Sequence, residues 1–187
     1  MNNLSSRELL HFGIYASKTK RSDVAIQYLK RLVDIEPNNY DGLFLLGSEF
    51  AEVGLFEEGI NAMKQVIESV EDAHLVRFQL AMLYVTTGLN DKALKQFQVL
   101  SDLPGDNALS IFSAGLTAII QEDKQQGIAL LEKGLTLPSN NDALSQNMSK
   151  MLEKIKASDG ADSEQVTTMT ENSDDRSSKM FLSVYDS

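Results

Sequence analysis

Apolar residues recur along the chain with helical spacing, in short segments separated by polar breaks. In one segment Leu43, Leu46 and Phe50 fall on a single helical face, because residues three and four apart are neighbours on a helix surface. Gly54 interrupts this pattern, and a second apolar face follows over residues 56–70. The segment therefore predicts two helices joined by a short turn.

Small residues recur at one fixed interval along the chain, which indicates an internal repeat. Two such series run in register: Gly13, Gly47, Ala81 and Gly115, and then Ala25, Gly59, Ala93 and Gly127. All three prolines, Pro37, Pro104 and Pro138, lie near the end of a repeat, where proline commonly follows a helix. The chain is thus divided into four repeats of equal length, 6–39, 40–73, 74–107 and 108–141.

This pattern resembles the tetratricopeptide repeat (TPR) family. Counting the first residue of each repeat as position 1, the family motif expects bulky residues at 4, 7, 11 and 24, with small ones at 8, 20 and 27. The best matches are Leu9, Phe12, Gly13, Ala25 and Leu29 in repeat one, Leu43, Leu46, Gly47 and Phe50 in repeat two, and Leu80, Ala81, Tyr84, Ala93 and Phe97 in repeat three. Repeat four departs most, and position 27 holds Leu32, Val66, Leu100 and Gly134 in place of alanine. The resemblance implies an all-α fold, a right-handed α-solenoid of helix-turn-helix repeats, with a protein-binding function.

The residues after the repeats divide into two parts. Residues 142–158 predict one amphipathic helix, with Leu144, Met148 and Leu152 on its apolar face, that covers the end of the solenoid. Residues 1–158 then form the solenoid domain, while 159–187 are polar and acidic and predict a disordered tail. Near its end the tail becomes apolar, which suggests a linear motif for docking in cis or for recruiting a protein. The motif residues are Met180, Phe181, Leu182, Val184 and Tyr185.

Composition and charge narrow the function classes. The 187 residues carry 27 acidic and 17 basic side chains, a net charge of −10. Nucleic-acid binding needs clustered basic residues to neutralise phosphates, so this acidity argues against it. The chain has no cysteine and two histidines, which leaves few residues for thiolate zinc sites or histidine relays. No signal sequence or membrane-spanning stretch is apparent, so we expect a cytoplasmic location.

No catalytic or metal-binding pattern appears in the sequence. Phosphate-binding glycine loops, dinucleotide fingerprints and calcium loops are all missing. His11 and His74 are interpreted as ordinary surface or groove side chains. We therefore expect neither enzymatic activity nor a cofactor.

The first helices of the repeats carry a further series of apolar residues that the motif does not require. Position 5 holds Leu10, Phe44, Phe78 and Phe112, and position 9 includes Ile14, Met82 and Leu116. Leu45, Leu75 and Leu109 at positions 6 and 2 extend the set. Because the resemblance places these positions on the concave side, they predict a groove that binds an apolar segment of another protein.

Two alternatives to a partner-binding groove remain open for this apolar surface. The side chains could form core covered by the chain itself, or a homodimer surface, since large exposed apolar patches are rare on monomers. The function predicted is a non-enzymatic adaptor or chaperone. The alternative is a structural subunit of a larger assembly, or a secretion-type chaperone that dimerises through the same face.

Overall fold

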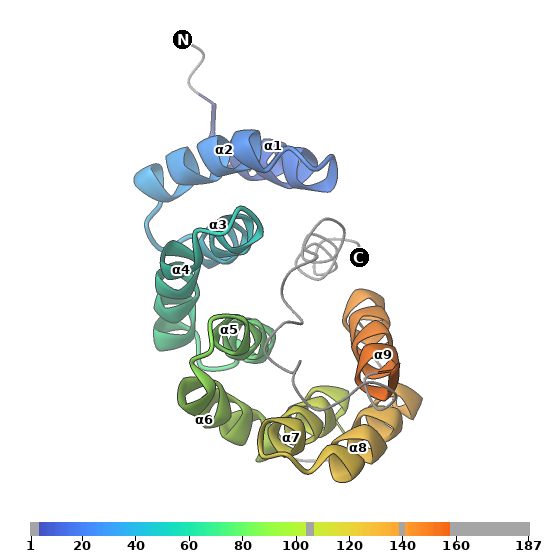
Figure 1. Ribbon diagram of the computed structural model, residues 1–187. Helices are drawn as coiled ribbons and strands as arrows, with labels where there is room; N and C mark the ends of the chain where they lie inside the picture. The colour runs from blue at the N-terminus through green and yellow to red at the C-terminus, as the bar shows by residue number, and fades with distance from the viewer. Residues whose placement is uncertain (1–3, 104–106, 139–140, 158–187) are drawn as a thin grey trace. The chain divides into compact units, whose positions relative to one another are not determined.

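The computed structural model describes residues 4–103, 107–138 and 141–157, and in these ranges every regular element is an α-helix (Figure 1). Their bounds are α1 Ser6–Lys18, α2 Ser22–Ile35, α3 Tyr40–Glu52, α4 Phe56–Ser69, α5 His74–Thr86, α6 Asn90–Ser101, α7 Ala108–Ile120, α8 Lys124–Thr136 and α9 Asp142–Ala157. The chain forms two compact units that divide after Val76, within the first turn of α5. Each unit is described by itself below.

The helices begin with the period that the sequence predicts. The first helices of the repeats start at Ser6, Tyr40, His74 and Ala108, which are evenly spaced at the interval of the glycine and alanine series. The second helices start at Ser22, Phe56, Asn90 and Lys124, again at that interval. The predicted all-α architecture of four helix-turn-helix repeats is therefore confirmed.

The turn inside each repeat has the same backbone conformation. Position 15 adopts a positive φ in all four copies, at Lys20, Gly54, Gly88 and Glu122. The residue after it donates its backbone N–H to the carbonyl five residues earlier, as Leu55 does to Phe50 over 2.8 Å. This is the Schellman arrangement, which closes a helix with one residue in the left-handed region. Two turns use glycine, which adopts that region without steric cost.

Polar side chains cap the first helices of several repeats. In α1 the Ser5 hydroxyl accepts from the Glu8 backbone N–H, while the Glu8 carboxylate accepts from the Ser5 backbone N–H over 2.8 Å. This capping box holds the pKa of Glu8 below its ordinary value, because the hydrogen bonds favour the charged carboxylate. Asn39 and Asn107 cap α3 and α7 in simpler form.

Glycine and alanine allow the two helices of a repeat to approach closely. A Cβ atom on Gly47 in α3 would lie 3.1 Å from the Gly59 carbonyl oxygen in α4 and 3.2 Å from Ala62 Cβ. In α7 a Cβ on Gly115 would lie 3.2 Å from the Gly127 carbonyl oxygen in α8. Positions 8 and 20 are therefore small because the two helix backbones nearly touch there.

The core of the first unit joins α1, α2 and α3. Its buried members are Leu9, Ala16, Ala25, Leu29, Leu32, Leu45, Leu46 and Phe50. One polar pair lies buried within this unit: the Ser17 hydroxyl donates to Oε1 of Glu49. The second repeat thus stacks on the first mainly through apolar contacts, with one hydrogen bond embedded in them.

Within the described residues, the last helix of the second unit is α9, which packs beside α8. Asp142 follows the start of α7 by one full repeat length, so α9 occupies the place of a fifth first helix. Its buried residues are Leu144, Met148, Leu152 and Ile155. At positions 5 and 12, where α7 carries Phe112 and Ile119, α9 has the exposed polar residues Gln146 and Glu153. A helix with this polar outer side closes a stack of repeats instead of receiving another helix.

Candidate partner-binding surface

Two of the three phenylalanines at position 5 pack inside their own repeats. Phe78 is completely buried, and its ring meets that of Phe97 in α6 edge to face, with 5.7 Å between centroids. Phe112 is also completely buried, and a Cβ added to Gly134 in α8 would lie 2.5 Å from its Cε1 atom. These two side chains face the second helix of the repeat. The expectation that they line an open groove is corrected here.

Other members of the predicted set are buried too. Leu45 belongs to the core of the first unit, between the first and second repeats. Phe44 and Leu116 are 4% and 3% exposed, so neither offers appreciable surface to a partner. For these positions the structure agrees with the alternative that they serve as core.

The rest of the set keeps part of its surface open. Leu10 and Ile14 in the first unit are half-buried and pack against the edge of its core. Leu75, at the start of α5, is also half-buried, as are Met82 and Leu109 in the second unit. Four of these five occupy positions 2 and 9, whereas position 5 is exposed in part only at Leu10 in repeat one.

The geometry of a helix explains why position 5 is buried in most repeats while positions 2 and 9 keep part of their surface exposed. Position 8 faces the second helix of the same repeat, as the Gly115 contacts show. Positions 5 and 12 lie three residues before and four after it, on the same helical face. Ile119 at position 12 accordingly lies against Gly127, at which a Cβ would be 2.4 Å from its Cδ1. The small residues at position 8 therefore already indicate, from the sequence, that positions 5 and 12 face the second helix.

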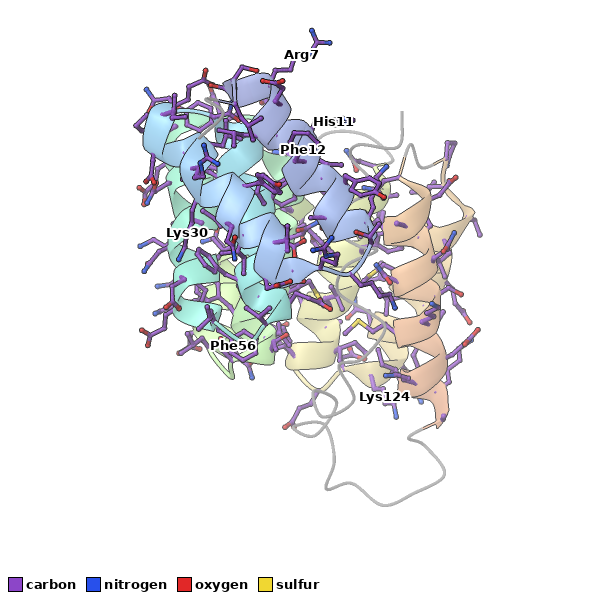
Figure 2. All side chains as sticks on the ribbon, turned by 90° about the horizontal axis from the view of Figure 1, so that it is seen from above. Arg7, His11, Phe12, Lys30, Phe56 and Lys124 are labelled. Atoms are coloured by element: carbon purple, nitrogen blue, oxygen red, sulfur yellow. The ribbon has the colours of Figure 1, made fainter. Side chains whose placement is uncertain are left out.

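A second apolar surface lies on α1, at residues that sequence reasoning assigned to no site. Phe12 and Tyr15 are 39% and 62% exposed, and the Phe12 ring lies 5.4 Å from that of Tyr28 in α2. His11 is exposed beside Phe12, with ring centroids 6.0 Å apart. Figure 2 shows Arg7, His11 and Phe12 following one another along this helix.

The described residues show no arrangement that would hold a metal ion: no three His, Asp or Glu side chains converge in them. His74 lies at the start of α5, with its Nε2 atom 3.8 Å from the Asp72 carboxylate. Of the helices in residues 4–103, 107–138 and 141–157, none has the length and apolar character needed to cross a membrane. The tail 159–187, with its motif at residues 180–185, lies outside the described residues, as does residue 158.

Comparison with known proteins agrees with the repeat architecture. The family model described as "Tetratricopeptide repeat" matches residues 9–39, which comprise most of α1 and all of α2. The same helix pair recurs three more times at the same period. The chain is a tetratricopeptide repeat protein. Members of this family are generally modules for protein–protein interaction and typically lack catalytic activity.

Solved structures similar to this TPR protein share its fold. "Crystal structure of MamA protein" matches with a TM-score of 0.60 and 17% sequence identity, over 81% of this chain and 82% of that one. "MamA 41-end from Desulfovibrio magneticus RS-1" matches with a TM-score of 0.60 and 13% identity, over 84% of this chain and 97% of that one. At such identities the likeness concerns the fold alone. No curated protein matches the chain.

Proposed function

We propose that this TPR protein is a non-enzymatic adaptor or chaperone that binds an apolar segment of another protein. The observation that carries the proposal is the apolar character of positions 2 and 9 where they stay half-exposed. Met82 and Leu109 do so in the second unit, and Ile14 and Leu75 do so in the first. Single exposed apolar side chains are common on proteins, but here four of them recur at the same two positions of the first helices, which supports a shared binding role.

The chemistry of these residues favours an apolar ligand over a charged one. Leucine, isoleucine and methionine offer no hydrogen-bond donor to a carboxylate. The flexible thioether of Met82 can adapt to ligands of different shape. An amphipathic helix, which presents apolar residues at three- and four-residue spacing, is the partner segment that fits such side chains.

Peptide binding to the full chain tests this function. The probe is a fluorescent amphipathic peptide with a Leu/Phe face, and its control has the same composition in scrambled order. We expect pattern-dependent binding that Met82→Asp or Leu109→Asp weakens by at least about tenfold, because a charge enters an apolar contact. Val99→Asp is the matched control, since Val99 is exposed on the second helix of its repeat. Equal binding of both peptides, or equal loss in Val99→Asp, would overturn the proposal.

A further inference from the structure

Helix α7 in the second unit carries no charged residue, and it leaves apolar side chains partly open. Leu109 and Ile120, at positions 2 and 13 of this helix, are half-buried, as is Met82 at position 9 of α5. Positions 2, 9 and 13 share one side of a helix, and equivalent positions of stacked first helices face the same side of a repeat array. Together these three side chains are the apolar surface of the second unit.

In α9, which takes the place of the next first helix, the same positions carry positive charge. Lys150 and Lys154 occupy positions 9 and 13, the first exposed and the second half-buried. A third lysine, Lys156, is already paired with Glu132 of α8. Acidic side chains also border this part of the unit, namely Glu153 at position 12 of α9, and Glu122 and Asp123 in the turn after α7. On the side that positions 9 and 13 form, however, both charges of α9 are positive.

The tail has acidic and apolar residues in the order that matches these helices. Residues 158–179, which follow α9, contain six acidic and two basic side chains. The motif at residues 180–185 then has five apolar or aromatic residues in six. A segment that leaves α9 and turns toward α7 passes its acidic residues beside Lys150 and brings its apolar residues to Leu109 and Met82. The tail is therefore complementary to this side of the unit in both charge and apolar character.

The covalent link to α9 favours the tail over a free partner of the same chemistry. A coil of about 22 residues, the length of 158–179, has a root-mean-square span of about 25 Å. Helix α7 has 13 residues and is thus about 20 Å long. Tethering over such a span gives an effective concentration on the order of millimolar. A free segment of equal intrinsic affinity has to reach that concentration to compete equally.

We propose that the motif at residues 180–185 docks on the apolar surface of the second unit, with the acidic residues before it beside the two lysines of α9. The inference rests on the proposed function, because it assigns an occupant to part of the same binding surface. A partner segment then binds only after it displaces the tail. The tail thereby raises the partner concentration that binding requires.

Thiol labelling of the full chain, without added peptide, tests the docking. The chain has no cysteine of its own, so a Leu109→Cys variant reports on this surface alone. Adding Phe181→Asp and Leu182→Asp should speed its labelling by about threefold or more, because the charges oppose the apolar contact. Adding Val166→Asp and Met169→Asp, which place the same charge in the tail outside the motif, should leave the rate unchanged. Equal rates for the two double substitutions would overturn the proposal, as would protection that grows with protein concentration, since a second copy would then supply the motif.

Disulfide trapping detects the contact itself and adds no charge. Leu182→Cys should link within one chain to Leu109→Cys faster than to Val99→Cys, because a disulfide needs Cα atoms within about 7 Å. Undirected encounters would favour residue 99, which is 47% exposed on the second helix of its repeat. Faster linking to residue 99 would contradict the docking. Preferential linking to residue 109 in a chain that binds no amphipathic peptide, even with the motif charges in place, would instead support the docking and refute the proposed function.

Discussion

Phe78 offers the sharpest test of which side of a first helix forms the core. Its side chain is completely buried and meets Phe97 edge to face across the two helices of repeat three. Phe78→Ala removes the ring and leaves a cavity, which typically costs about 3–5 kcal/mol of unfolding free energy. The aromatic pair accounts for about 0.5–1.5 kcal/mol of such an effect. For a chain of this size we expect Tm to fall by roughly 6–20 °C.

Urea unfolding followed by far-ultraviolet circular dichroism measures this loss, because the chain has no tryptophan to report by fluorescence. Met82→Ala is the matched control on the same helix, since Met82 is only half-buried, and it should cost about 1 kcal/mol or less. Combining Phe78→Ala with Phe97→Ala should show coupling of about 0.5–1.5 kcal/mol. A loss below about 1 kcal/mol for Phe78→Ala, with a larger loss for Met82→Ala, would refute the conclusion that the position 5 side of this helix forms the core.

Three further predictions concern the polar and backbone features of the first unit. Ser17→Ala should destabilise the fold by about 1–3 kcal/mol in urea unfolding, because it leaves the buried Glu49 carboxylate without its donor; an unchanged midpoint would contradict the buried pair. Gly54→Ala should cost about 1–2 kcal/mol, since a Cβ finds open space there but φ is +80°; a neutral effect would show that the turn relaxes. The capping box lowers the pKa of folded Glu8 below 4.5, so its stabilisation is complete above about pH 4.5 and is lost as pH falls through the folded value. Glu8→Gln should therefore flatten the acid limb of a pH–stability profile, and an unchanged limb would argue against the cap.

Much of the fold could be predicted from the sequence, because its signals are local and repeated. The small residues at positions 8 and 20 mark where helix backbones meet, and the helix starts follow their period. Gly54 and Gly88 likewise mark the turns. Their equivalents Lys20 and Glu122 adopt the same positive φ although neither is a glycine. Here the surrounding helices impose the conformation, which residue preference alone would not indicate.

The candidate site could be predicted only in part. The family resemblance placed position 5 in the groove, whereas its spacing from the small residue at position 8 places it on the face toward the second helix, where Phe112 lies. Gly134 interrupts the family pattern at position 27 because the Phe112 ring fills that space. Sequence reasoning noted the departure but could not pair the two residues. The exposure of Tyr15 was missed for a different reason: its equivalent in the second repeat, Glu49, is buried against Ser17 of α1, whereas Tyr15 itself is 62% exposed.

Thiol labelling at residue 82 tests the central claim most directly, that the half-buried apolar side chains at positions 2 and 9, Met82 among them, bind a partner. In the cysteine-free chain, a Met82→Cys variant should react with a thiol reagent, more slowly than an exposed cysteine at residue 99 because position 82 is half-buried. Saturating amphipathic peptide should slow the reaction at residue 82 by at least about tenfold and leave residue 99 unaffected. Unchanged labelling at residue 82 in the presence of peptide that is shown to be bound would contradict the account.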